Sequence, residues 1–162
     1  MELWDSYDGN GRRIPGETLV RGQSVPEGRF HLVCEILVQH RDGTYLLMQR
    51  DPNKHYGGFW EATAGGSALQ GEGPTDCALR ELREETGIQA TDLTELGTVV
   101  HRARRTIYVE FLCLTDWDKS SVTLQLGETV AFHWVAGEEL RALDKSSLVT
   151  TRMQMFLPEL QK

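Results

Sequence analysis

The feature that most constrains this chain is a short acidic helix set between glycine-rich segments at residues 66–88. Pro74 suits the first turn of a helix and Gly87 suits the position just past its end, so the pattern predicts a helix between them. Four residues recur at helical spacing and are expected to face the core: Ala78, Leu79, Leu82 and Thr86. A single helix of this kind among strand-like segments must be buried against a sheet.

Strand-like apolar runs predict that sheet. They lie at 30–39, 45–50, 59–63, 93–101, 106–115 and 129–135. Residues 2–21 surround an Asp-Gly-Asn-Gly turn and predict a hairpin-like extension within an N-terminal segment 1–28. Residues 51–66 are rich in glycine and are expected to be mostly loop, and 147–157 are expected to form a C-terminal helix that Pro158 stops. These elements predict one α+β domain, residues 1–162, with helices packed on a mixed sheet.

Composition excludes several classes of partner. The formal net charge is -7 and the pI is about 5.2, so neither a nucleic acid polymer nor an anionic membrane is expected to bind. No apolar run approaches the roughly 20 residues of a membrane helix, and the first residues do not resemble a secretory signal. Cys34, Cys77 and Cys113 form no metal or disulfide pattern and are expected in the core, which indicates a reduced, cytoplasmic location. A homodimer is left open.

The helix carries three carboxylates on one face. Glu81, Glu84 and Glu85 are related by three and four residues, so their side chains are neighbours and repel one another. A hard divalent cation such as Mg²⁺ or Mn²⁺ would turn that repulsion into binding and could bridge the protein to substrate phosphates. The alternative is a solvated face in which Arg80 and Arg83 neutralise the glutamates. The glycines on both sides of the helix favour the metal interpretation.

The whole segment 66–88 resembles the Nudix box. The pattern is Gly, five residues, Glu, seven residues, then Arg-Glu-aliphatic-any-Glu-Glu-any-Gly-aliphatic. Every fixed position is filled, by Gly66, Glu72, Arg80, Glu81, Leu82, Glu84, Glu85, Gly87 and Ile88. The later run 128–134 is also similar to the family, so that the resemblance covers about residues 30–160.

The resemblance implies a fold and a reaction. The fold is an α/β/α sandwich with a mixed sheet, in which Gly66 and Gly87 are structural and Glu72 pairs with Arg80 to brace the loop against the helix. The implied metal ligands are Glu81, Glu84 and Glu85. The implied reaction is metal-dependent hydrolysis of a diphosphate linkage in a nucleoside diphosphate derivative or a related organic diphosphate. The candidates for the carboxylate that activates water are Glu85, Glu81 and the later Glu128.

A narrower resemblance points to the substrate's phosphates. Residues 48–54, 57–60 and 3–8 are similar to the isopentenyl-diphosphate isomerase branch of the family, in which a similarly spaced arginine and lysine bind the diphosphate. Arg50 and Lys54 are the corresponding candidates here. The basic patch at 102–105 supplies further candidates, Arg104 among them.

Two alternatives to hydrolysis follow from the resemblance. The first is isomerisation of isopentenyl diphosphate, but Gly65 and Ser67 stand where the isomerases have their catalytic cysteine and a metal-ligating histidine. Neither residue supplies the acid and base that move a proton along an alkene. The second is a module that binds a nucleotide or sugar phosphate without turnover, which has no need of the three glutamates.

Overall fold

The computed structural model describes residues 1–143, so the predicted C-terminal helix at 147–157 lies outside the described residues. Two strands form an N-terminal hairpin, β1 (Leu3–Tyr7) and β2 (Arg13–Val20). The main sheet contains β3 (His31–His40), β4 (Tyr45–Arg50), β5 (Trp60–Ala62), β6 (Ala64–Ser67), β7 (Leu93–His101), β8 (Thr106–Thr115) and β9 (Thr129–Val135). The helices are α1 (Pro74–Thr86), the short α2 (Gly137–Ala142) and a 3-10 turn η1 (Lys119–Ser121).

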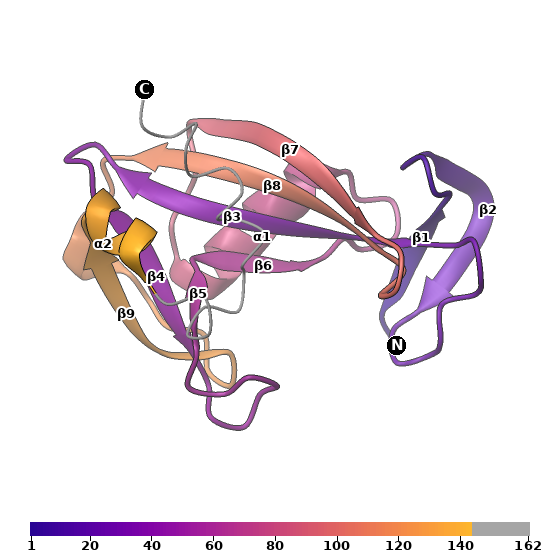
Figure 1. Cartoon of the computed structure of the whole chain (residues 1–162), viewed down its shortest axis with the longest axis horizontal. Coiled ribbons are helices and arrows are strands. Elements are labelled where there is room, and N and C mark those ends of the chain that lie inside the picture. Colours follow the sequence, from indigo (N-terminus) through magenta and orange to yellow (C-terminus); the bar gives the residue numbers. More distant parts are fainter. Residues whose placement is uncertain (144–162) are drawn as a thin grey trace.

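The main sheet is mixed. Its path is β5-β4-β3-β8-β7, with β6 paired to β3 and β9 paired to β4. β3 and β8 run parallel over ten residue pairs, whereas the other pairings are antiparallel. In Figure 1 the long strands β3, β8 and β7 lie side by side, with the N-terminal hairpin at one end and β9 and α2 at the other. No helix among the described residues is long and apolar enough to cross a membrane.

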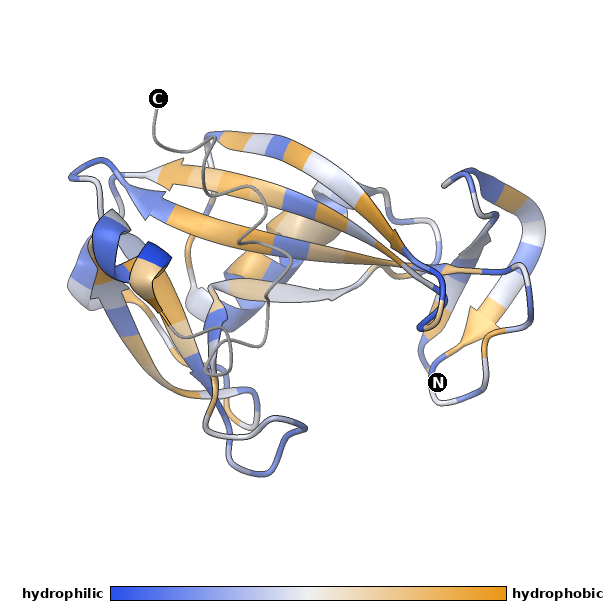
Figure 2. Cartoon of the chain, viewed as in Figure 1, coloured by the Kyte–Doolittle hydropathy of each residue, from blue (hydrophilic) through white to orange (hydrophobic). Residues whose placement is uncertain are grey.

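Alternating side chains divide the core between the two faces of this sheet. Ile36 and Val38 of β3 pack in one cluster with Leu82 of α1, whereas Leu37, which lies between them in the chain, packs in a second cluster with Leu140 of α2. The two helices therefore cover opposite faces, as the predicted α/β/α sandwich requires. Figure 2 shows the apolar residues concentrated along the central strands and the polar residues in the turns.

Most predicted strands lie where expected, and the exception is the one rich in glycine. Residues 64–66 belong to the segment 51–66 that is expected to be mostly loop, but together with Ser67 they form β6 and pair with β3. Gly65 is required there because the strand lies very close to the backbone of β3, whereas the neighbour of Gly66 is the end of a flexible side chain. A Cβ on Gly65 would lie 2.7 Å from the carbonyl oxygen of Cys34, and a Cβ on Gly66 would lie 2.2 Å from the Glu81 carboxylate.

One residue predicted to be in the core is not there. Leu79 is 38% exposed, whereas Cys77, Ala78, Leu82, Glu85 and Thr86 are the buried residues of α1. The helix is rotated over the sheet so that Glu85 is buried on the face that packs against the sheet, whereas Leu79 lies at the edge of that face and is partly exposed. All three cysteines are free and buried, as predicted.

The N-terminal hairpin is attached to the main domain by specific contacts. Tyr7 exchanges two backbone hydrogen bonds with Phe30, each 2.9 Å long. The ring of Trp4 stacks on His31 with centroids 4.5 Å apart. At the loop before α1, the backbone N–H of Gln70 donates to Leu3 and that of Gly71 donates to the Asp5 carboxylate, both at 2.9 Å. The hairpin thus lies against the loop that leads into the acidic helix.

Candidate active site

Helix α1 begins and ends as its sequence predicts, and this sets the direction of its glutamates. Pro74 occupies the first turn, where no intrahelical donor is needed. Gly87 takes a left-handed conformation with φ of 78°, and its N–H donates to the carbonyl of Arg83. Between these ends Glu81 and Glu85 face the sheet and the loop, while Glu84 is more exposed.

Arg80 is the central cation of the segment. Its guanidinium makes two bonds to the Glu72 carboxylate, at 2.7 and 2.9 Å, and donates to the carbonyl of Ser67 at 3.1 Å. This planar, two-bond pairing fixes the loop against the helix. The same guanidinium lies 2.7 Å from Glu81 and 3.3 Å from Glu84, so the charge pairing expected of a solvated face is also present.

Glu85 is the most deeply buried carboxylate of the three, with 5% of its surface exposed. Burial raises the pKa of Glu85 well above its ordinary value, and the nearby charges of Glu61 and Glu81 raise it further. The backbone N–H of Gly65 donates to Glu85 at 3.5 Å. Burial likewise raises the pKa of Glu81, although Arg80 opposes this effect. An uncompensated negative charge is therefore unfavourable here, and a cation would stabilise it.

Arg50 has a buried partner that the sequence did not reveal. Its Nη1 lies 2.8 Å from Oε2 of Glu61, and its Nε donates to the carbonyl of His55 at 2.9 Å. Burial raises the pKa of Glu61 despite this pairing, and the charge of Glu128 adds to the effect. Arg50 thus connects the end of β4 with β5 and with the loop between them.

Lys54 and Glu128 form an ion pair across two loops. The backbone N–H of Asp51 also donates to the carbonyl of Glu128 at 2.9 Å. These contacts join the loop between β4 and β5 to the segment that precedes β9. The two loops lie side by side at the lower end of the molecule in Figure 1.

The predicted phosphate-binding and acidic residues meet in one pocket of about 420 Å³. Its lining includes Arg50, Lys54, Gly66, Arg80, Glu81, Glu84, Glu85 and Glu128. Glu2 and Arg21 of the N-terminal hairpin also line it, and they form an ion pair of 2.9 Å. Cations and carboxylates far apart in the sequence therefore surround a single polar space.

Arg104 is not brought to this pocket. It lies with Arg102 and Arg105 in the turn between β7 and β8, where its backbone N–H bonds to His101 at 3.2 Å and Arg105 bonds to the carbonyl of Val25. None of these arginines is among the described residues that line the pocket. The assignment of Arg104 to substrate binding thus stays a prediction without support from the position of its side chain.

Sequence reasoning missed Glu61, Glu2 and Arg21. Glu61 could have been noticed, because a carboxylate inside an apolar strand-like segment needs a partner or a function. Glu2 and Arg21 carried no such signal, because exposed charges at the ends of a hairpin are common. Their place in the pocket depends on how the hairpin is packed.

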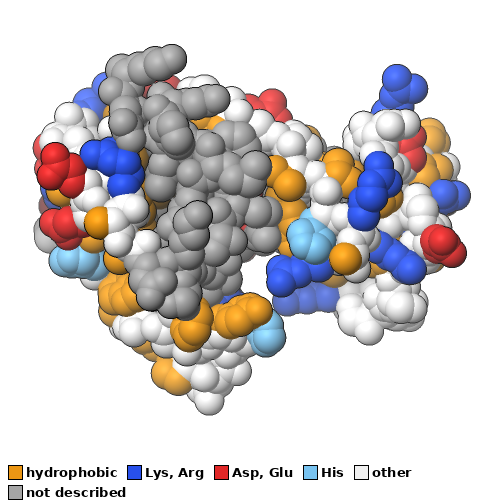
Figure 3. All heavy atoms as spheres, viewed as in Figure 1, with side chains coloured by type: hydrophobic (Ala, Val, Ile, Leu, Met, Phe, Trp, Pro, Cys, Tyr) orange, Lys and Arg blue, Asp and Glu red, His pale blue; other side chains and the backbone are white. Residues whose placement is uncertain are grey.

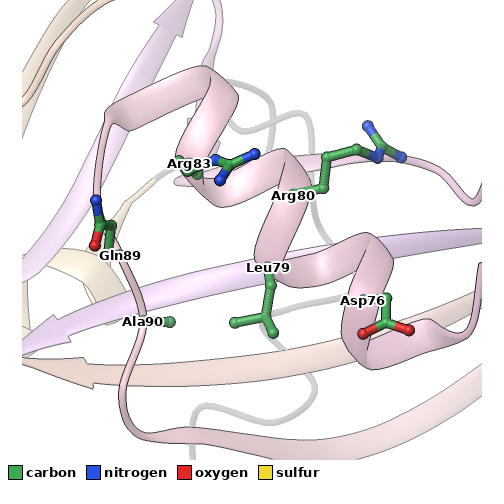
Figure 4. Close-up of a pocket in the computed structure, with 6 residues that line it drawn as sticks. All are labelled: Asp76, Leu79, Arg80, Arg83, Gln89 and Ala90. Atoms are coloured by element: carbon green, nitrogen blue, oxygen red, sulfur yellow. The ribbon is translucent and has the colours of Figure 1, made fainter.

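A second hollow of about 420 Å³ lies on the outer face of α1. It is lined by Asp76, Leu79, Arg80, Arg83, Gln89 and Ala90, and Figure 4 shows these residues along the helix and the segment that follows it. It contains one carboxylate and an exposed leucine. The arrangement needed for phosphate chemistry is found instead on the other side of Arg80.

The donor set of the pocket fits a hard divalent cation. Its ligand groups are carboxylates, and burial together with the charges of Glu61 and Glu81 raises the pKa of Glu85. Among the described lining residues, no sulfur or imidazole competes for the cation. As they stand, no three acidic, histidine or cysteine side chains of residues 1–143 are grouped closely enough to hold an ion. Arg80 contacts Oε1 of Glu81 and Oε2 of Glu84, so the second oxygen of each carboxylate is not engaged by Arg80 and could ligate a cation while Arg80 keeps Glu72.

Comparison with known proteins bears on the same segments. Residues 29–154 match the model of the NUDIX domain family. An uncharacterised Nudix hydrolase of Listeria monocytogenes is 35% identical over 90% of this chain and 86% of its own length. An 8-oxo-dGTP diphosphatase of Proteus vulgaris is 34% identical over 65% of this chain and 92% of its own length.

Two further similarities concern the isopentenyl-diphosphate isomerase branch of the family and the fold. An isopentenyl-diphosphate Delta-isomerase of Streptomyces avermitilis is 34% identical over 60% of this chain and 49% of its own length. A crystal structure of a Deinococcus radiodurans protein superposes with a TM-score of 0.78 at 14% identity, covering 99% of this chain and all of that one. The latter similarity supports the mixed-sheet fold, including the part that carries the N-terminal hairpin.

Proposed function

This chain belongs to the Nudix family and is one of its hydrolases, and from this premise we propose that it cleaves the diphosphate linkage of a nucleoside diphosphate derivative or a related organic diphosphate. The proposal includes dependence on Mg²⁺ or Mn²⁺. It treats residues 1–162 as one domain and the protein as cytoplasmic, in keeping with its free, buried cysteines.

The observation that carries the proposal is the pocket itself. Two cations suited to phosphate oxygens, Arg50 and Lys54, line the same space as the carboxylates Glu81, Glu84 and Glu85. A diphosphate in this space would replace the carboxylates that now pair with these cations. Arg50 now pairs with Glu61, and Lys54 now pairs with Glu128. One of the similar proteins is named as a diphosphatase, in agreement with this chemistry.

The residues of the chain divide the work of hydrolysis among them. Arg50 and Lys54 hold the diphosphate so that one phosphorus lies beside the carboxylates. Glu85 or Glu128 accepts a proton from water, whose oxygen forms a bond to that phosphorus while the bridging P–O bond breaks. The bond's electron pair leaves on the oxygen of the departing phosphate. Mg²⁺ or Mn²⁺, when bound by Glu81, Glu84 and Glu85, supplies positive charge that stabilises the phosphate oxygens.

Isomerisation of isopentenyl diphosphate is the second candidate, because the chain resembles those isomerases over 60% of its length. Two features of the pocket argue against it. Gly65 and Ser67 line the pocket and offer no acid–base pair for moving a proton along an alkene. Among the described lining residues, Leu69 is the one large apolar side chain, so little of a prenyl group would be covered.

A phosphate-release assay that scores phosphomonoester products as well as inorganic phosphate tests the proposal. The wild-type protein is incubated with nucleoside diphosphate derivatives, dinucleotides and isopentenyl diphosphate, first with Mg²⁺, then with Mn²⁺, then with excess chelator. We expect release from at least one diphosphate with a divalent cation and none with chelator. Formation of the allylic isomer without any cleavage would replace the hydrolase by the isomerase, and binding without turnover would favour the non-catalytic module.

A further inference from the structure

The loop between β4 and β5 carries two exposed aromatic rings beside the residues that face the pocket. Tyr56 is 45% exposed and Phe59 is 37% exposed, and their ring centroids lie 5.7 Å apart at an angle of 43°. The ring of His55 lies 4.1 Å from that of Tyr56. Figure 3 shows hydrophobic side chains together with a histidine on the lower part of the molecule, where this loop lies. Two exposed rings close together offer a flat apolar surface on which a planar ligand can lie.

The loop is held in one shape by its own hydrogen bonds. The backbone groups of Arg50 bond to those of Phe59 and Gly58 at 2.9 and 3.0 Å, and the Arg50 side chain donates to the carbonyl of His55. Lys54 and Gly57 close a turn through a bond of 2.9 Å. The rings are therefore fixed relative to Arg50 and Lys54, the two residues that line the pocket from this loop.

The backbone conformation of Tyr56 is unfavourable for a residue that carries a side chain. It is the third residue of the turn from Lys54 to Gly57 and has a φ of 56°, in the left-handed region where side chains are disfavoured. Glycine would fit this position without strain, as it does at Gly58, whose φ is 81°. A large ring kept at such a position, and left exposed, indicates a use for the ring itself.

We infer that Tyr56 and Phe59 form a stacking platform for the nucleobase of the substrate, so that the substrate class is the nucleotides rather than the prenyl diphosphates. The inference rests on the proposed function, because Arg50 and Lys54 must first hold the diphosphate. The base then lies outside the polar pocket and against the rings of the same loop. Stacking accepts any base because every base has a flat π face.

A prenyl group would not be recognised in the same way. It needs apolar walls on several sides, whereas the loop that carries the rings is otherwise largely polar, with Asp51, Asn53 and His55. The pocket beside Arg50 and Lys54 is lined mainly by charged groups. A planar base with polar edges can stack on one face and remain hydrated at its edge, which suits an open platform of this kind.

The test compares probes with and without a base. Adenosine 5′-diphosphate and cytidine 5′-diphosphate carry one, methyl diphosphate does not, and geranyl diphosphate carries an apolar chain instead. Dissociation constants are measured by calorimetry in Mg²⁺ for the full-length wild type, Tyr56→Leu, Tyr56→Phe and Phe59→Leu. Leu79→Ser, at a similarly exposed apolar residue on α1, is the control.

Tyr56→Leu is expected to weaken binding of both nucleotides by about five- to 150-fold, the equivalent of the roughly 1–3 kcal/mol of base–aromatic stacking. Its affinity for methyl diphosphate should stay within about twofold of wild type, because this probe has no base to stack on the ring. Tyr56→Phe and Leu79→Ser should bind the nucleotides as the wild type does. Unchanged nucleotide affinity in both leucine variants would overturn the inference, as would a loss confined to geranyl diphosphate.

A further variant separates binding from structure. Tyr56→Gly removes the ring and relieves the left-handed strain, so its melting temperature should be equal to or above that of the wild type while its nucleotide affinity falls. A lowered melting temperature with unchanged affinity would make Tyr56 a structural residue and overturn the inference. Because binding is measured directly, nucleotide binding without hydrolysis would contradict the proposed function and leave the platform supported.

Discussion

Arg50 donates from Nη1 to Oε2 of Glu61 over 2.8 Å, and both side chains are largely shielded from water, with 16% and 12% of their surfaces exposed. The pair therefore serves the fold as well as the pocket that Arg50 lines. Burial already raises the pKa of Glu61 while Arg50 is present. Without the guanidinium, the carboxylate would be buried without its cation, which is strongly destabilising.

Arg50→Ala is accordingly expected to lower the free energy of unfolding by on the order of 3 kcal/mol, as for a buried pair that loses one partner. The double variant Arg50→Ala, Glu61→Gln should recover part of this loss, because no buried charge remains. Urea unfolding of the three proteins measures both effects. Substrate affinity should stay low in the double variant, since the loss of the phosphate contact is not repaired. If the double variant bound substrate normally, Arg50 would be structural alone.

The two glutamates at the end of α1 should separate activity from stability. Glu84→Gln with Glu85→Gln removes two proposed metal ligands, and turnover should be abolished. The fold should be retained or slightly stabilised without metal, because a buried carboxylate whose pKa is raised by burial and by Glu61 becomes a neutral amide. Phosphate release and thermal melting of the metal-free proteins measure the two outcomes. Activity that persists in this variant would remove both residues from the site.

The brace between loop and helix depends on the shape of arginine. Arg80 makes two bonds to Glu72 and one to the carbonyl of Ser67, which lysine cannot reproduce with a single ammonium group. Arg80→Lys should lower the free energy of unfolding by about 1.5–3 kcal/mol, the range for hydrogen bonds to charged groups. Turnover should fall with it because the loop that carries Gly66 is less well held. Arg83→Lys on the outer face of the same helix is the control and should change neither quantity.

The hairpin's attachment should depend on pH through His31. Burial lowers the pKa of His31 from its ordinary value near 6.5, and the neutral ring stacks on Trp4. A depressed pKa in the folded state means that the unfolded chain binds the proton more readily. The stability from this site is therefore complete above pH 6.5 and is lost as pH falls from there through the lower pKa of the folded state.

His31→Phe keeps a flat ring against Trp4 and cannot be protonated. Urea unfolding is measured between pH 7.5 and pH 5, a range that includes the window in which the depressed pKa of His31 affects stability. The variant should lose less stability over this range than the wild type. Proton NMR titration of His31 gives its pKa directly. A pKa at or above 6.5 would contradict the assignment.

The parts of the fold that could be predicted from sequence are those encoded by local chemistry. Pro74 and Gly87 mark the ends of α1, and short, nearly continuous apolar runs mark β3 and β4. Strand β6 was missed because its glycines are typical of loops. Glycine is needed at position 65 because a Cβ there would lie 2.7 Å from the carbonyl oxygen of Cys34, a contact between segments far apart in the sequence that no local pattern records.

The candidate site, like the fold, has one part that could be predicted from the sequence and one part that could not. The helical spacing of Glu81, Glu84 and Glu85 places them on one face, so their grouping could be predicted. The partners of the phosphate-binding residues could not, because Glu61 and Glu128 reach Arg50 and Lys54 only through the pairing of β4 with β5 and β9. Leu79 was misplaced because apolar periodicity alone does not set how far a helix is rotated over its sheet.

The most direct test of the central claim is product analysis in water labelled with ¹⁸O, using the wild-type protein, Mg²⁺ or Mn²⁺, and a diphosphate that the phosphate-release assay has identified. Hydrolysis by attack of water on phosphorus predicts one labelled oxygen in a phosphate product, detected by mass spectrometry, and no label in the Glu84→Gln, Glu85→Gln variant. Unlabelled phosphates, or the allylic isomer of isopentenyl diphosphate with its diphosphate intact, would contradict the account.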